Sequence, residues 1–178
     1  MTQQDHTNGT VARSGRAAIY GRIATREQTQ ASQALQSQMA ALIAFANEHG
    51  YSSERIIVYE DVSIASSKSR ARQKALSDLL AAISQEGQEP IRAIYVSCEH
   101  RLFRDLGAVE LARFVAVCAD HGVQLLTPTA IYDFSTLDQV ALFRFECERA
   151  ASYLAEQINM LMQPYRTGES ATRKPMEE

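Results

Sequence analysis

The chain has no long hydrophobic run, no surplus of basic residues and few cysteines. None of its 178 residues lies in an apolar run of the roughly 18 needed to span a bilayer. The formal net charge of −3 excludes strong non-specific attraction to DNA or an anionic membrane, so any contact with DNA must be local. The three cysteines lie far apart, and residues 1–15 contain no secretory core. We therefore expect a cytoplasmic protein without membrane contact.

Motifs for bound nucleotides and metals are missing as well. The sequence contains neither a GxxxxGK[ST] loop nor a GxGxxG turn, which argues against a P-loop or Rossmann nucleotide-binding protein. Cys98 and His100 have no second pair of ligands elsewhere, so a zinc site is not expected. They also make a poor nucleophile and base, since neighbouring residues at a strand end point in different directions. We predict neither a cofactor nor a metal.

Short runs rich in Ile, Val and Tyr alternate with helical patterns along the chain. Four such runs are typical of strands buried on both faces: 16–21, 54–60, 91–97 and 123–127. Between them, apolar residues recur every three or four positions, as on the buried face of a helix. This order predicts an α/β fold, a mostly parallel sheet of four to five strands with flanking helices and a long C-terminal helix.

The last helical segment lacks Gly and Pro from about residue 136 to Met162, and Pro164 should end it. At about 1.5 Å per residue it would be roughly 40 Å long and should project. Apolar residues recur along it with the spacing of a helix seam: Val140, Phe143, Cys147, Ala150, Leu154 and Leu161. The seam lies either on its own domain or against another subunit, and we favour the second.

These patterns divide the chain into four segments. Residues 1–15 are predicted to be disordered, 16–135 to form the α/β domain, 136–163 to form an oligomerisation helix, and 164–178 to form a disordered tail.

Charged residues follow three of the predicted strands. The loops that leave the carboxyl ends of parallel strands gather at one edge of the sheet, where ligands usually bind. The residues concerned are Arg22, Thr25, Gln28, Asp61, His100, Arg101 and Arg104. Guanidinium groups match phosphate oxygens, and Arg101 and Arg104 share one turn, so we predict a phosphate site here. For any single arginine, solubility is the simpler explanation.

Several stretches occur in the order of a known family's motifs. The stretch "YGRIATREQ" is similar to Tyr-x-Arg-Val-Ser-Thr-x-x-Gln at the end of a first strand, and "HRLFRDL" is similar to Asp-Arg-Leu-x-Arg. The stretch "YEDVSIASSKSRARQKALSDLL" is similar to a mobile loop and second helix. The stretches "IYDFST" and "ECERAASYLAEQI" are similar to the start and middle of a long dimerising helix. Over roughly residues 16–162 the chain thus resembles the serine recombinases, the resolvase and invertase family.

The resemblance implies metal-free phosphoryl transfer in DNA, in which a serine hydroxyl attacks the scissile phosphate and arginines stabilise the phosphorane. Arg22, Arg101 and Arg104 match arginines around that phosphate, and Gln28 and Asp61 match polar residues of the same site. Arg72 is a possible match for an arginine of the mobile loop, which is about a residue longer here.

Ala24 stands where the nucleophilic serine of the family belongs. A methyl group cannot attack phosphorus, so the covalent route is lost. Thr25 offers a hydroxyl next to it, but the family motif already has Thr there, and one step along a strand turns the side chain to another face. His100 replaces an Asp and Cys98 stands where a Lys is common. Natural loss of activity explains all these changes more simply than an engineered Ala24.

We therefore expect a recombinase-type domain that does not cleave DNA and acts as an oligomerising or regulatory partner. Its partner would be a second copy or a complete recombinase, bound through residues 136–163. DNA would be bound weakly or through that partner, because the residues after Met162 are too few for a DNA-binding domain. The alternatives are an active recombinase, whose nucleophile is Thr25 or was removed by engineering, and a binding module that keeps only the fold.

Overall fold

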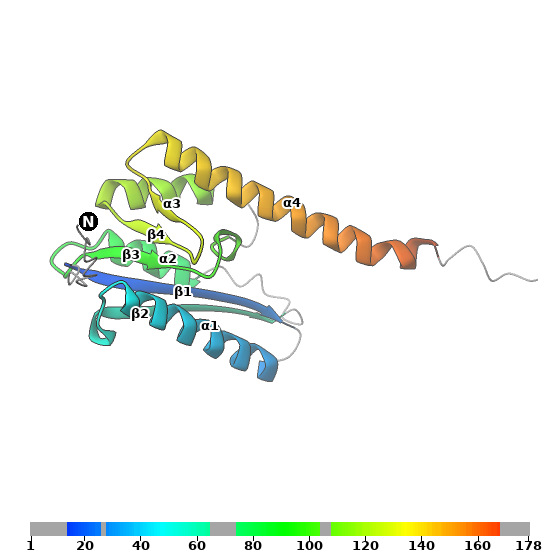
Figure 1. Cartoon of the computed structure of the whole chain (residues 1–178), viewed down its shortest axis with the longest axis horizontal. Helices are drawn as coiled ribbons and strands as arrows, with labels where there is room; N and C mark the ends of the chain where they lie inside the picture. The colour runs from blue at the N-terminus through cyan, green and yellow to red at the C-terminus, as the bar shows by residue number, and fades with distance from the viewer. Residues whose placement is uncertain (1–13, 26–27, 65–73, 104–107, 168–178) are drawn as a thin grey trace, which may run out of the picture.

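The structure, a computed structural model, describes residues 14–25, 28–64, 74–103 and 108–167. In this part of the chain five strands form one sheet: β1 (Arg16–Thr25), β2 (Ile56–Ile64), β3 (Ile91–Tyr95), β4 (Gln124–Leu126) and β5 (Ile131–Asp133). The helices are α1 (Gln28–Glu48), α2 (Lys74–Ile83), α3 (Ala108–His121) and α4 (Leu137–Thr167), with 3-10 turns η1 (Ser53–Arg55) and η2 (Glu99–Arg101) (Figure 1).

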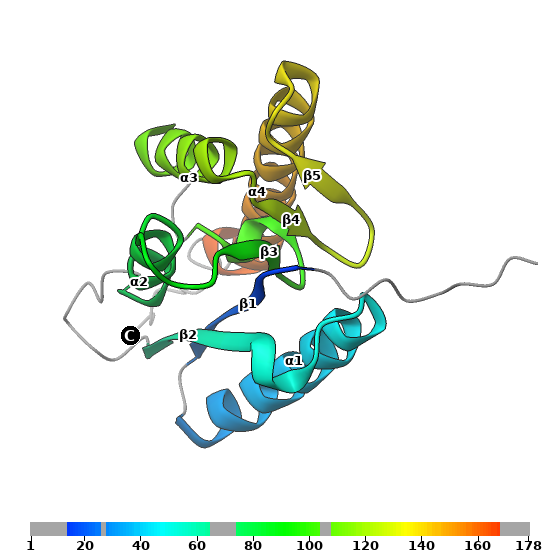
Figure 2. The same cartoon turned by 90° about the vertical axis from the view of Figure 1, so that its left-hand side faces the viewer.

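The strands lie in the order β2-β1-β3-β4-β5. The first three pairings are parallel and the β4–β5 pairing is antiparallel. Helix α1 covers one face of the sheet, and α2 and α3 cover the other (Figure 2). The predicted α/β class with a mostly parallel sheet is confirmed. Because the covering helices change face between β1 and β3, the carboxyl ends of these two strands form the topological switch point, where sheets of this kind bind ligands.

Alternate residues of β1 enter two separate hydrophobic cores. Ala17 and Ile19 pack with Leu42 and other residues of α1. Ala18 and Tyr20 belong to the larger core, which α2, α3 and α4 share. A strand whose successive side chains point to opposite faces is thus buried on both, which explains its continuous apolar run.

Strands β1 and β2 are longer than predicted. They pair in register from Ala17–Ile56 to Thr25–Ile64, and Ala24 lies opposite Ser63. Arg22 and Thr25, which were predicted to follow the first strand, therefore lie within β1, and so does Ala24. The polar residues after Gly21 resemble a turn in sequence, but each strand supplies backbone hydrogen-bond partners for the other, and this pairing outweighs the weak β propensity of single residues.

The predicted runs did not include β5. It has three residues, too few for an alternating pattern, and it reverses the chain after β4. The buried Thr127 builds the reversal, since its hydroxyl oxygen accepts the backbone N–H groups of Thr129 at 3.3 Å and of Ala130 at 3.0 Å. A threonine turn of this kind gives little sequence signal.

The first half of the α4 seam packs on its own domain. Phe143 and Cys147 are fully buried in the larger core, and Val140 packs against it. This corrects the expectation that these residues face another subunit. The periodicity identified a buried stripe but not the surface that buries it. The side chains of Leu154 and Leu161 are outside the described residues.

Helix α4 extends beyond the sheet (Figure 1) and continues through Pro164 to Thr167, although the proline was expected to end it. Pro164 has no backbone N–H, so the last turn of α4 lacks the hydrogen bond to the carbonyl oxygen of Met160. Residues 164–167, which were predicted to begin a disordered tail, are therefore helical. The rest of the predicted tail, 168–178, and residues 1–13 of the predicted N-terminal disorder (1–15) fall outside the described residues. None of the helices in the described part of the chain combines the length and apolar character needed to cross a membrane.

Two phenylalanines of α4 test this packing. Phe143 is fully buried, whereas Phe145 is 59% exposed. We expect Phe143→Ala to lower the free energy of unfolding by about 3–5 kcal/mol, because it empties a space among four aromatic rings. In dilute, monomeric protein, Phe145→Ala should change it by less than about 0.5 kcal/mol. Urea denaturation measures both. Equal losses would contradict the orientation of α4.

Candidate functional site

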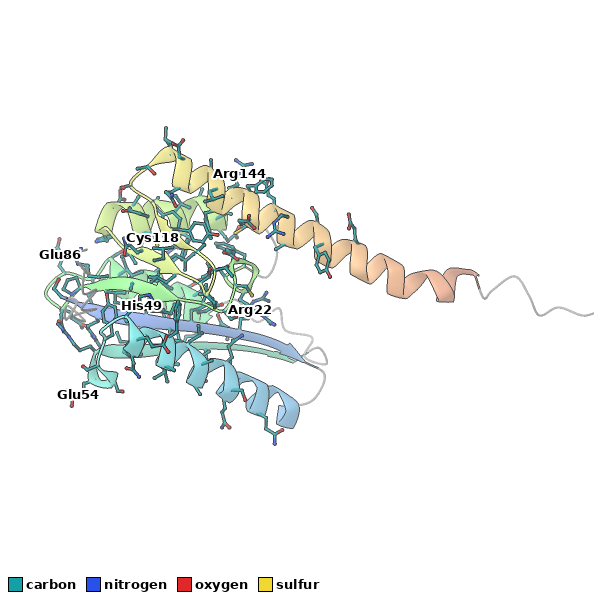
Figure 3. All side chains as sticks on the ribbon, viewed as in Figure 1. Arg22, His49, Glu54, Glu86, Cys118 and Arg144 are labelled. Carbon is teal, nitrogen blue, oxygen red and sulfur yellow. The ribbon has the colours of Figure 1, made fainter. Side chains whose placement is uncertain are left out.

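Arg22 and Arg101 bind each other's backbone at the carboxyl edge of the sheet. The Arg22 Nε donates to the carbonyl oxygen of Arg101 and its Nη2 to that of Phe103, each at 3.1 Å. In return, the Arg101 Nη1 donates to the carbonyl oxygen of Arg22 at 3.1 Å. Arg22 lies near the end of β1, in the half of the domain from which α4 extends (Figure 3). We call these three hydrogen bonds the arginine clasp.

One polar atom of the Arg101 side chain, the buried Nε, has no hydrogen-bond acceptor among the described residues. A buried guanidinium N–H without an acceptor is costly, because it has lost its hydration and gained no hydrogen bond. The next residues, Leu102 and Phe103, are 0% and 4% exposed, and they anchor this segment in the core. The arginine is therefore held in place with one buried donor that is unsatisfied among the described residues.

Asp61 supports helix α2 from the neighbouring strand. Its carboxylate accepts the backbone N–H groups of Ala75 at 3.1 Å and Leu76 at 3.3 Å, which are at the start of α2. It also accepts the Tyr20 hydroxyl at 2.9 Å. An acidic group at a helix N-terminus satisfies free N–H groups and complements the helix dipole. With three donors bound, the Asp61 carboxylate joins β1, β2 and α2.

The remaining predicted site residues are described only in part. The backbone of Ala24 lies in β1, two residues after Arg22, and Gln28 is the first residue of α1. The structure does not describe the side chains of Ala24, Thr25, Gln28 and His100, and Arg72 and Arg104 lie outside the described residues. Of the predicted residues, the structure thus brings Arg22 and Arg101 together, and it places Asp61 opposite Arg22 in the β1–β2 register.

Sequence reasoning missed a polar pair next to the clasp. The hydroxyl of the buried Tyr132 donates to the Glu99 carboxylate at 2.6 Å. Burial, and then the hydrogen bond to Glu99, raise the pKa of Tyr132, so the phenol keeps its proton. The two residues are 33 positions apart, and the short strand β5 brings them together.

The buried cysteines do not supply a nucleophile. Burial raises the pKa of Cys118 and of Cys147 to about 12, and for Cys147 the carboxylates of Glu99, Glu146 and Glu148 add to the effect. Both thiols therefore stay protonated and unreactive. Over the described ranges, no three His, Cys, Asp or Glu residues gather in a way that would hold a metal ion.

Residues 17–161 match the family model described as "Resolvase, N terminal domain". The chain belongs to the resolvase family. The predicted family is thus confirmed, while the assignment of Ala24 to the nucleophile position stays a prediction. No curated protein matches the chain in sequence.

Two solved structures share the fold of this resolvase-family chain. A resolvase family site-specific recombinase from Streptococcus pneumoniae has a TM-score of 0.55 at 20% identity, over 88% of this chain and 99% of that one. The N-terminal catalytic domain of TP901-1 integrase has a TM-score of 0.53 at 19% identity, over 80% of this chain and 98% of that one.

Replacing Asp61 tests its capping role. We expect Asp61→Ala to lower the free energy of unfolding by about 1–2 kcal/mol, because two N–H groups of α2 and the Tyr20 hydroxyl lose their acceptor. The control is Asp78→Ala on the exposed side of the same helix, where a loose contact with Lys74 is worth little. Chemical denaturation compares the two variants, and similar small losses would argue against the cap.

Proposed function

We propose that this chain is a serine-recombinase-type domain associated with site-specific DNA recombination. It binds DNA phosphates without cleaving the DNA strand, and it acts as an oligomerising or regulatory partner in the cytoplasm. The arginine clasp is the observation that carries this proposal: Arg22 and Arg101 lie together at the switch point, and within the described part of the chain the buried Nε of Arg101 has no acceptor. Family membership supports it, as do the printed descriptions of the two similar structures, a site-specific recombinase and the catalytic domain of an integrase.

The proposed site holds a phosphodiester by charge. Arg22, Arg101 and Arg104 would donate to its non-bridging oxygens, as guanidinium groups do with high geometric specificity. Gln28 and Arg72 would complete the surroundings, and Asp61 would stabilise them through β2 and α2. With a methyl group at Ala24 nothing attacks the phosphorus, so the DNA backbone stays intact.

The outer face of α4 is the proposed oligomer contact. Leu142, Phe145 and Tyr153 are 45%, 59% and 63% exposed, and their spacing places them along one side of the helix. Large apolar residues grouped on an exposed helix face favour association with another chain. The inner seam is already used within the domain, so a homodimer, or a hetero-oligomer with a complete recombinase, would form through this outer face.

A supercoiled plasmid assay tests the absence of cleavage. We expect the protein to retard the plasmid in a gel at low salt, and we expect no protein covalently attached to nicked ends after proteins are denatured. An adduct from the unchanged chain would contradict the proposal. If Thr25→Val then abolished the adduct, Thr25 would be the nucleophile and the chain an active recombinase.

Substitution of Phe145 tests the oligomer contact. We expect the unchanged chain to dimerise at micromolar concentration and Phe145→Ser to raise the dissociation constant by roughly tenfold or more, because a large apolar side chain no longer becomes buried. Arg144→Ser is the control, since Arg144 is an exposed residue of α4 (Figure 3) that pairs with Glu148 on its own helix. Sedimentation velocity measures all three proteins. A monomeric unchanged chain, or equal effects of both substitutions, would contradict the contact.

A further inference from the structure

We propose that Tyr132 is a positioning residue for Arg101: its hydroxyl holds Glu99 and thereby fixes the turn that presents the arginine. The proposal rests on the phosphate-binding role of the arginine clasp put forward above. It assigns a function to β5, which carries Tyr132 beside η2.

Two hydroxyl groups converge on one carboxylate oxygen. The Tyr132 hydroxyl donates to the Glu99 Oε1 at 2.6 Å, and the Thr127 hydroxyl lies 3.5 Å from the same atom. Tyr132 and Thr127 are 1% and 2% exposed, while Glu99 is half-buried. A hydrogen bond from a hydroxyl to a carboxylate at this short distance is of the strong, charge-assisted kind. The Glu99 side chain is therefore held by the β4–β5 reversal.

Glu99 and Arg101 are the two ends of one rigid turn. In η2 the backbone N–H of Arg101 donates to the Cys98 carbonyl and that of Leu102 to the Glu99 carbonyl, each at 3.1 Å. A displacement of Glu99 consequently moves the backbone of Arg101. That backbone supplies the carbonyl oxygen that accepts the Arg22 Nε, and it carries the side chain that reaches back to Arg22. The Tyr132–Glu99 contact therefore controls both halves of the clasp.

Packing alone does not require a tyrosine at this position. The ring of Tyr132 stacks with Phe134 at 6.5 Å between centroids and contacts Phe143 edge-on at 5.2 Å, contacts that a phenylalanine would make equally well. A hydroxyl buried among these rings is unfavourable unless it has a partner. Because burial and Glu99 raise the pKa of Tyr132, the hydroxyl stays a donor at neutral pH.

The experiment measures binding of a fluorescently labelled DNA duplex by anisotropy between about 50 and 200 mM salt, with thermal unfolding of each variant alongside. We expect Tyr132→Phe to weaken DNA binding roughly 3- to 10-fold. The binding should also depend less on salt, as we expect for Arg101→Ala, because a misplaced guanidinium neutralises phosphate less. The matched control is Tyr51→Phe, a tyrosine buried in the other core, which should bind like the unchanged chain. A purely structural loss would lower stability without changing the salt dependence.

A second pair of variants separates the hydrogen bond from charge. Glu99→Gln and Glu99→Ala both remove the negative charge, but only the glutamine can still accept the Tyr132 hydroxyl. We expect Glu99→Gln to bind more tightly than Glu99→Ala, and this comparison applies even if Tyr132→Phe fails to fold. Equal binding by the two variants would overturn the proposal.

The outcomes also distinguish the two proposals. If Arg101→Ala weakens binding while a folded Tyr132→Phe binds with unchanged affinity and salt dependence, the positioning role is wrong and the phosphate site stands. If Arg101→Ala itself binds like the unchanged chain, the phosphate role of Arg101 is wrong, and the positioning role falls with it.

Discussion

The reciprocal hydrogen bonds of Arg22 and Arg101 join β1 to the turn after β3. They bring two positive side chains close together, which is unfavourable unless negative or partly negative groups surround them. Backbone carbonyl oxygens supply part of that compensation. The nearby carboxylates have other partners: Asp61 binds the start of α2, and Glu99 binds Tyr132. In the proposed role, an added anion such as a phosphodiester would improve the balance of charge around the pair.

The residues around the clasp hold it in place rather than add chemistry to it. Asp61 ties the end of β2 to α2, and β2 in turn pairs with β1 as far as Thr25. On the other side, Leu102 and Phe103 fix the turn in the core, and Tyr132 fixes Glu99. Binding sites need such support, because a guanidinium contributes most when it is already oriented before the ligand arrives.

The sequence predicted the α/β class, the four main strands and the family, because buried parallel strands and helix faces leave continuous or periodic apolar patterns. It did not predict the contacts that depend on distant segments. The Tyr132–Glu99 pair requires β5, whose three residues leave no pattern. Asp61 caps a helix that begins 13 residues later in the chain, so no local capping motif reveals it. The α4 periodicity correctly marked Phe143 and Cys147 as buried, but a period cannot say which surface covers them.

The clasp does not depend on the residue at position 24. Each bond of the clasp ends on a backbone carbonyl, so none of them depends on the side chain at residue 24. Replacing either arginine breaks the link between β1 and η2, whereas an alanine at residue 24 leaves that link intact. The three hydrogen bonds therefore give Arg22 and Arg101 a structural role in addition to the proposed one. The proposed role draws on the Nε of Arg101, a buried donor without an acceptor among the described residues, which a bound anion would satisfy.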